Sequence, residues 1–276
     1  MINVKQIKVE VTKSNDENIK KGIAKKLNIP VYDIDDYNII KRSIDARNKE
    51  EICYVYEVDV NVKNEEKVLK KKNNDITYAI SRKYEIKEFG NIELKNRPII
   101  IGSGPAGLFS AYILAENGYK PIIIERGEQV EDRVNSVESF WKNGNLNKNS
   151  NVQFGEGGAG TFSDGKLNTL VKDEFNRGRK VFETFIECGA NEEIIYDYKP
   201  HIGTNVLRDV IKNIRSKIID MGGEFRFNTC LTNIIYENNT IKQIELNNNE
   251  LIDTDILVLA IGHSARDTFS MLYEIN

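Results

Sequence analysis

The stretch RPIIIGSGPAGLFSAYILAENGYKPIIIERG, residues 97–127, decides the fold of this chain. It opens with the apolar run 98–101, which is typical of a buried parallel strand. Apolar residues then recur at helical spacing over 108–115, and Gly118 lies where a helix commonly ends. A second apolar run at 122–124 predicts another buried strand. The stretch therefore predicts a strand–helix–strand unit.

Three glycines join the first strand to the helix in G-x-G-x-x-G spacing: Gly102, Gly104 and Gly107. The first permits a tight turn, the second lets a pyrophosphate approach the backbone, and the third lets the helix pack closely on the strand. The helix N-terminus presents free N–H groups to phosphates. Glu125 ends the second strand, where a carboxylate can accept hydrogen bonds from a ribose diol. An ordinary glycine turn is the alternative, but the complete context favours a dinucleotide site.

Composition restricts the class of protein. The chain has 276 residues with 40% hydrophobic and 29% charged, and its net charge is -3. This balance predicts a globular protein with room for two domains and argues against nucleic acid as a partner. The three cysteines form no C-x-x-C pair, and no metal-ligand cluster stands out. Because no apolar signal or transmembrane stretch is present, we expect a cytoplasmic protein without a membrane partner.

Residues 1–95 predict a small α+β domain. Ile7, Val9 and Val11 alternate as in a strand, and Ser14 with Glu17 forms a capping-box pattern before a helix ending near residue 28. Strands are expected at 37–44, 52–62 and 76–80, with a short helix at 65–72. This β-α-β-β-α-β order is that of a ferredoxin-like fold. A polar linker around residues 87–95 should join it to the α/β domain, 96–276.

The segment KRSIDAR, residues 41–47, concentrates charge within the first domain. One interpretation is a turn with local ion pairs, since surface charge clusters are common. The other is a surface that docks onto the second domain or onto a substrate. The sequence leaves both open.

A second informative stretch is NVQFGEGGAGTFSDGKL, residues 151–167. Its five glycines suggest close backbone approach to a flat or charged ligand, because glycine otherwise costs conformational entropy. Phe154 and Phe162 would anchor the segment from the apolar side. The alternative is a mobile surface loop.

The remaining chain predicts a Rossmann-like parallel sheet with a small β-meander. Thr204 is a candidate N-cap for a long amphipathic helix that ends near Gly222. Short strands are expected at 225–231, 233–236 and 241–246, separated by Asn-rich turns. A final buried strand at 256–260 leads into Gly262.

These motifs together resemble a bacterial group of uncharacterised FAD-dependent dehydrogenases, also described as NAD(P)/FAD-dependent oxidoreductases, of the glutathione-reductase-type FAD-binding fold. SIDAR, residues 151–167, HIGTNVL and LAIGHSARDTFSML carry the resemblance. It implies FAD, with Glu125 at the adenosine ribose, Arg126 beside the adenine and main-chain atoms of Leu231 at the adenine edge. It places Gly157, Gly158 and Ala159 of the loop on the flavin side. The implied pyrophosphate contacts are Gly102, Ser103, Gly104, Pro105, Ala106 and Gly107, with Gly262 nearby.

Members of that group continue well beyond the point where this sequence ends. The later part resembles a substrate domain followed by a segment that returns to the flavin. The sequence therefore resembles the N-terminal portion only. We expect a fragment or half of a split enzyme, with a missing C-terminal half or a redox partner.

Several side chains are candidates for chemistry beside a flavin. Lys166 could stabilise a negatively charged reduced flavin, or be a surface lysine paired with Asp164. His263 and His201 could donate protons or be structural. Arg266 could bind a substrate carboxylate or pair with Asp267.

The leading hypothesis is a FAD-dependent oxidoreductase acting on a small molecule that the sequence does not identify. NAD(P)H is a candidate electron donor, although no second G-x-G-x-x-G unit is present. The alternative is a non-catalytic FAD-binding module acting as scaffold or redox sensor.

Overall fold

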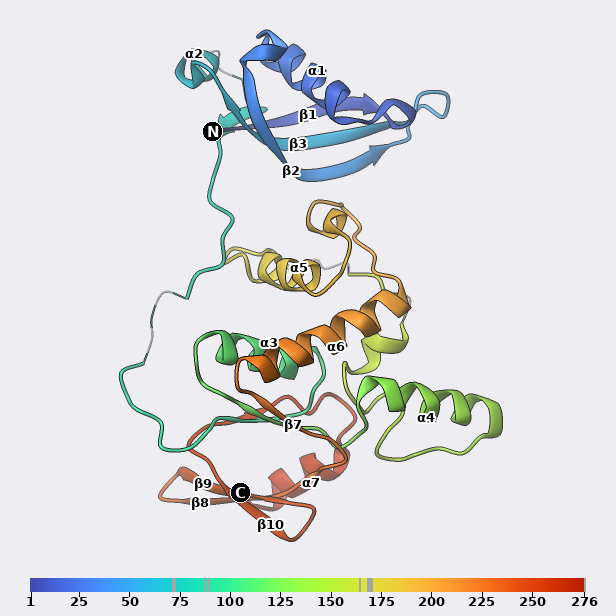
Figure 1. Cartoon of the computed structure of the whole chain (residues 1–276), viewed down its shortest axis with the longest axis vertical. Helices are drawn as coiled ribbons and strands as arrows, with labels where there is room; N and C mark the ends of the chain where they lie inside the picture. The colour runs from blue at the N-terminus through green and yellow to red at the C-terminus, as the bar shows by residue number, and fades with distance from the viewer. Residues whose placement is uncertain (71–72, 87, 89, 164, 168–170, 276) are drawn as a thin grey trace. The chain divides into compact units, whose positions relative to one another are not determined.

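A computed structural model describes residues 1–70, 73–86, 88, 90–163, 165–167 and 171–275 of the chain (Figure 1). The chain divides into two units. The first contains Met1–Glu85, Lys166–Glu183 and Asn191–His201. The second contains Ile86–Gly165, Thr184–Ala190 and Ile202–Asn276. The first unit thus includes two later segments in addition to the predicted N-terminal domain, and the boundary near residue 95 stays a prediction. Residues 87 and 89 of the predicted linker lie outside the described residues.

The first unit has the predicted ferredoxin-like order of elements. Its four-stranded sheet has the order β2-β3-β1-β4, and every neighbouring pair is antiparallel. Apolar side chains of α1, including Ile23 and Leu27, pack on those of the central strands in one buried core. The elements are β1 (Ile2–Glu10), α1 (Asp16–Leu27), β2 (Ile34–Asp45), β3 (Cys53–Val62), α2 (Glu65–Leu69) and β4 (Ile76–Tyr78).

Two local predictions in this unit are wrong. Val11 does not continue β1, because the chain turns into a 3₁₀ helix at Val11–Lys13. The capping box at Ser14 does not form. Asn15 caps α1 by accepting a 2.9 Å hydrogen bond from the Asn18 N–H, whereas the Ser14 hydroxyl hydrogen-bonds to the Tyr56 hydroxyl at 2.6 Å. A tertiary partner thus occupies the side chain that the local pattern assigned to the cap. In the lysine run at 70–72, Lys70 is the C-cap of α2, and residues 71 and 72 lie outside the described ones.

Residues 41–45 of the charged segment 41–47 form the end of the edge strand β2 rather than a turn. The guanidinium of Arg42 donates to both carboxylate oxygens of Asp197, at 2.7 and 3.0 Å, and to Glu193 at 2.9 Å. Backbone hydrogen bonds also join Arg42 to residues 196 and 198. The predicted local ion pair is confirmed for Arg47 and Asp45, at 2.7 Å. This sheet edge is therefore covered by a segment that follows it by about 150 residues in sequence.

The second unit is built on the predicted parallel sheet, of order β11-β5-β6-β7. Helices α3 and α6 cover one face, and a three-stranded antiparallel sheet with α7 covers the other (Figure 1). All residues of β5 and β6 are buried, as their uninterrupted isoleucines predict. The elements are β5 (Ile99–Ile101), α3 (Pro105–Glu116), β6 (Ile122–Ile124), α6 (Thr204–Asp220), β7 (Glu224–Arg226), β8 (Leu231–Glu237), β9 (Thr240–Leu246), β10 (Glu250–Asp253), β11 (Leu257–Leu259) and α7 (Arg266–Glu274).

The helix ends and turns of this unit refine the prediction. Gly118 follows the C-cap of α3 with φ +83°, as predicted. Thr204 is not the N-cap of α6, because Gly203 is, and the Thr204 hydroxyl donates instead to the carbonyl of Ser163 at 2.9 Å. Of the predicted strand at 225–231, only residues 225 and 226 lie in β7, because the chain turns where Asn228 has a φ of +53° and β8 begins at Leu231.

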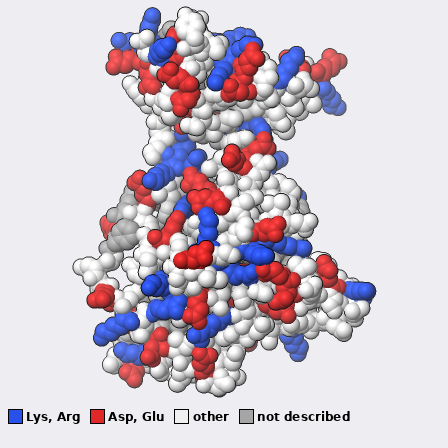
Figure 2. Space-filling view, in the orientation of Figure 1, with Lys and Arg blue, Asp and Glu red and all other residues white. Residues whose placement is uncertain are grey.

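The remaining elements are α4 (Val130–Asn143), α5 (Arg177–Glu187), η2 (Val31–Asp33), η3 (Ala159–Phe162) and η4 (Glu192–Ile195). No described helix combines the length and the apolarity that a bilayer-crossing helix requires. Lys and Arg side chains alternate with Asp and Glu over the face shown in Figure 2, in line with the small net charge of -3.

Candidate functional site

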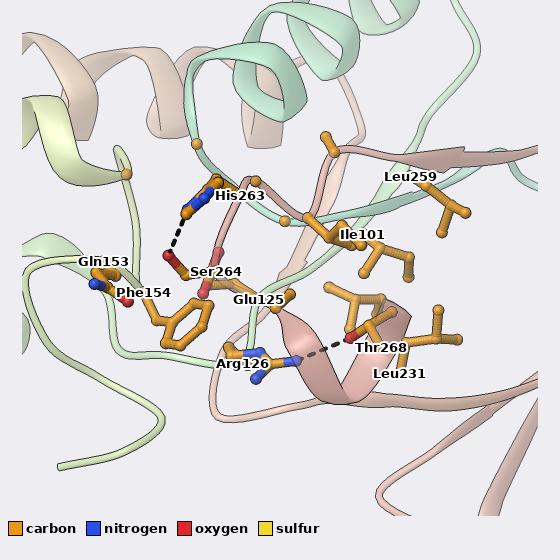
Figure 3. A pocket seen from close by; sticks show the side chains of 18 of the residues that line it. Ile101, Glu125, Arg126, Gln153, Phe154, Leu231, Leu259, His263, Ser264 and Thr268 are labelled. Atoms are coloured by element: carbon orange, nitrogen blue, oxygen red, sulfur yellow. Dashed lines mark hydrogen bonds between the residues drawn. The ribbon is translucent and has the colours of Figure 1, made fainter. Parts of the chain in front are cut away.

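A cavity of about 720 Å³ lies at the carboxyl ends of β5, β6 and β11 (Figure 3). The sheet order reverses here, because β6 lies on one side of β5 and β11 on the other. In open α/β sheets, ligands bind in this crevice. Its wall includes most of the predicted site residues: Gly102, Gly104, Pro105, Ala106, Glu125, Arg126, Gly158, Ala159, Leu231, Gly262 and His263.

Two of the three glycines in the turn are required by the fold itself. Gly102 has a φ of +97°, and a Cβ there would lie 2.4 Å from the carbonyl oxygen of Ala260. A Cβ at Gly107 would lie 1.8 Å from the carbonyl oxygen of Gly102. These contacts give both residues the roles that the spacing predicts, a tight turn and a close helix–strand approach.

Gly104 is different, because no protein contact requires a glycine there. Its φ is -68°, which any residue adopts, and an added Cβ would find the Cα of Gly158 at an ordinary 3.9 Å. It is the N-cap of α3 and has no side chain to cap the first turn. Since Gly104 lines the cavity, the free space and the helix N-terminus meet at one point of the wall. This arrangement fits an anionic group approaching the backbone.

Glu125 holds three loops of the cavity wall together. Glu125 is 4% exposed. Its carboxylate accepts hydrogen bonds from the backbone N–H and hydroxyl of Ser103, both 2.8 Å, and from the N–H groups of Gly127 and Gly155, at 2.9 and 3.1 Å. A carboxylate accepts about four hydrogen bonds, so donors of the chain itself occupy all of these sites. Contact between Glu125 and a ribose stays a prediction, and it requires one of these donors to be shared or exchanged.

Arg126 forms a second polar part of the wall. Its guanidinium pairs with Asp267 at 2.9 Å, donates to the hydroxyl of Thr268 at 3.0 Å and stacks over the ring of Phe154 at 4.6 Å (Figure 3). Asp267 therefore pairs with Arg126, although the sequence offered Arg266 as a local partner. Arg266 is exposed and does not line the cavity.

Arg133 organises the glycine-rich loop, and sequence reasoning gave it no role. It is fully buried, and its guanidinium donates to the carbonyl oxygens of residues 151, 152, 156 and 158 at 2.6 to 3.0 Å. Burial lowers its pKa to about 10. A signal was present, because Arg133 continues the buried stripe of Val130 and Val137 on α4. A charged residue within an apolar stripe predicts a buried side chain that is hydrogen-bonded to other polar groups.

The glycines of this loop are explained largely by packing within the protein. A Cβ at Gly155 would lie 2.5 Å from the Arg133 side chain, one at Gly157 would lie 2.3 Å from the Thr161 hydroxyl, and one at Gly165 would lie 1.6 Å from the carbonyl oxygen of Ile202. All three glycines have positive φ. Five residues of the predicted loop reach the cavity wall: Gln153, Phe154, Gly155, Gly158 and Ala159. The placement of this loop over a flavin stays a prediction.

Glu156 anchors the same loop to two helices. Its Oε2 atom accepts from the Val130 N–H at 2.8 Å and from Arg215 at 2.7 Å, while Oε1 is buried without a hydrogen-bond partner among the described residues. Burial raises the pKa of Glu156 to about 7, against the opposing effect of Arg215. The carboxyl group therefore titrates near neutral pH.

The other predicted residues are distributed unevenly. His263 lines the cavity, and its Nδ1 atom lies 3.3 Å from the Ser264 hydroxyl (Figure 3). Lys166 and His201 are exposed, pair through a backbone bridge and belong to the first unit. Asp164, the suggested partner of Lys166, lies outside the described residues.

Three predicted pyrophosphate or flavin contacts lie behind the wall. Ser103 is buried against Glu125, its carbonyl oxygen accepts from the Gly157 N–H at 2.9 Å, and Gly107 packs on the turn. These residues shape the wall without lining the cavity.

Parts of this chain are similar to two protein families and to one curated protein. Residues 100–154 match a family described as an NAD(P)-binding Rossmann-like domain. Residues 1–61 match DUF8436, a domain of unknown function. An uncharacterised protein of Clostridium beijerinckii is 49% identical over 259 residues, which cover 94% of this chain and 48% of that protein. The chain thus spans about half the length of the curated relative it matches.

Solved structures show more remote similarity. THI4 of Thermovibrio ammonificans has a TM-score of 0.41 at 18% identity, over 65% of this chain and 62% of that chain. OTEMO, crystallised with FAD and NADP, has a TM-score of 0.37 at 19% identity, over 62% of this chain and 26% of that chain. The family match and the parallel sheet agree on a Rossmann-like nucleotide-binding fold for the second unit.

Proposed function

We propose that this chain binds FAD at the cavity and supplies the nucleotide-binding part of a FAD-dependent oxidoreductase. One observation carries the proposal. At Gly104, a glycine that the fold does not require lines a cavity at the uncapped N-terminus of α3. A bound pyrophosphate explains the missing side chain, because a Cβ there would fill the space that the phosphate needs.

The cavity wall offers contacts for the rest of an adenosine diphosphate moiety. The pyrophosphate would meet residues 104–106, and the adenosine would extend toward Glu125, Arg126 and Leu231. The hydroxyl of Ser103 is the donor to Glu125 that a ribose hydroxyl can replace most simply, since the other three donors are backbone N–H groups. Gly262 leaves open space on the opposite side of the turn, as no atom lies within 4 Å of a Cβ built there.

FAD, when bound, supplies hydride and electron transfer, and the protein supplies orientation and charge. His263 is the proposed proton carrier, because its exposed ring lies in the cavity wall. NAD(P)H is the proposed electron donor, and the substrate is a small molecule.

The absorbance spectrum of the purified protein tests the proposal. We expect bound flavin that Gly104→Val removes, because a branched side chain fills the phosphate position. Gly160→Val is the matched control, since no atom lies within 4 Å of a Cβ at Gly160 and its φ is not positive. Flavin retained by Gly104→Val at the wild-type level would contradict the assignment.

Turnover with NADH or NADPH distinguishes two candidate functions. Flavin reduction by either donor supports the oxidoreductase. Bound flavin without reduction by any donor supports a non-catalytic FAD-binding module or half of a split enzyme.

A further inference from the structure

The ring of Phe162 contacts two arginine side chains beside the glycine-rich loop. The guanidinium carbon of Arg133 lies 4.8 Å from the ring centroid, and that of Arg208 lies 5.1 Å from it. Trp141 meets the same ring edge-on, with the centroids 6.1 Å apart. Two positive charges beside one ring repel each other, so each guanidinium requires acceptors or carboxylates that stabilise its charge.

Arg133 has this compensation within the protein. Its donors meet four loop carbonyls, and the carboxylates of Glu125 and Glu156 favour its charged form. Arg215, two turns after Arg208 on α6, is likewise paired, with Glu131 at 2.6 Å and Glu156 at 2.7 Å.

Arg208 has no comparable partner in the part of the chain that the structure describes. No hydrogen bond or ion pair involves its guanidinium, and its Nε atom is buried without an acceptor. A half-buried guanidinium with unused donors is unusual, because it loses hydration without gaining hydrogen bonds. Its planar fork matches the two oxygens of a carboxylate.

This guanidinium lies close to the proposed cofactor site. Helix α6 packs on η3, whose first residue, Ala159, lines the cavity. A 3₁₀ helix rises about 2 Å per residue, so Phe162 lies only ~6 Å along the helix from Ala159. An anion at Arg208 would therefore be bound beside the cavity wall formed by Gly158 and Ala159.

We propose that Arg208 binds the carboxylate of a small organic acid, whose apolar part lies against Phe162 and Trp141. Trp141 is 62% exposed and supplies an apolar surface that an inorganic anion does not use. The assignment of this acid as the substrate rests on the proposed function, whereas the carboxylate site itself does not. Arg266, the arginine that the sequence suggested for a substrate carboxylate, is absent from the cavity wall.

Calorimetric titration with benzoate and with inorganic phosphate tests the site in the full chain. We expect saturable benzoate binding, tighter than that of phosphate, with a Kd that Arg208→Gln raises at least about tenfold through loss of the charged fork. Lys212→Gln is the matched control on the same helix, because Lys212 is exposed and lies 3.7 Å from Glu131. It should leave the Kd within about twofold.

Three outcomes would overturn this inference: no saturable benzoate binding, equal binding of phosphate, or an unchanged Kd in Arg208→Gln. The flavin content of each protein is measured separately. Absence of flavin from the wild type would refute the proposed function and leave the benzoate result standing, so the two failures are distinguishable.

Discussion

Alanine substitutions at Gly104 and Gly107 should separate cofactor binding from folding. A Cβ at Gly104 would lie 3.9 Å from the Cα of Gly158, an ordinary contact, and the φ of -68° suits alanine. A Cβ at Gly107 would lie 1.8 Å from the carbonyl oxygen of Gly102, so α3 must move away from the turn. The same chemical change therefore meets free space at one position and backbone at the other.

The expected magnitudes follow from these distances. Gly104→Ala should lower the free energy of unfolding by no more than about 1 kcal/mol, the cost of alanine at an N-cap. The added methyl group displaces an anion from the backbone of the turn. Losing one hydrogen bond to a charged group costs about 1.5–3 kcal/mol, which corresponds to roughly a 10- to 150-fold rise in the Kd for FAD. Gly107→Ala should lower the free energy of unfolding by at least about 2 kcal/mol through overpacking.

Urea unfolding without added FAD measures stability, and a fluorescence titration measures the Kd for FAD. Gly160→Ala, where no atom lies within 4 Å of the added Cβ, should change neither quantity. The reasoning fails if Gly104→Ala unfolds at as low a urea concentration as Gly107→Ala. It also fails if Gly104→Ala binds FAD with wild-type affinity.

Three further substitutions test other parts of the structure. Arg133→Met should lower the free energy of unfolding by about 3–5 kcal/mol, because four loop carbonyls lose their donor; a loss below about 1 kcal/mol in urea unfolding would contradict this role. Burial raises the pKa of Glu156 from 4.5 to about 7, so the native state holds this proton more tightly than the unfolded chain. The free energy of unfolding should then fall by up to about 3 kcal/mol as pH rises through that window, and Glu156→Gln should abolish this slope in thermal melts. Arg42→Met should speed proteolysis within residues 191–201, whereas Arg47→Met, which loses only the local pair with Asp45, should not.

Much of the fold was predictable because its signals are local. The isoleucine runs of β5 and β6 and the glycine spacing between them specify a buried strand–helix–strand unit without reference to distant residues. Alternation in β3 and the helical period of α1 likewise predicted the elements of the ferredoxin-like unit. Their order then restricted the topology to few choices.

The errors occur where a distant partner competes with a local pattern. Ser14 fits a capping box, but the hydroxyl of Tyr56, 42 residues away, binds its side chain. Thr204 fits an N-cap, but it bonds to the carbonyl of Ser163, 41 residues away. Local reasoning cannot weigh such contacts, because they exist only after the elements have packed.

The sequence alone determined that this protein has a glycine turn, a following helix and a terminal Glu125, because each depends on backbone conformation and periodicity within a few residues. Only the tertiary structure decided how these parts are used. It distinguished Gly104, which faces free space, from Gly107, which faces backbone. It also gave Glu125 hydrogen-bond donors from three loops, and it left the Arg208 guanidinium without a hydrogen-bond or ion-pair partner among the described residues. Hydrogen-bond satisfaction and burial are properties of packed neighbours, so the linear pattern does not contain them.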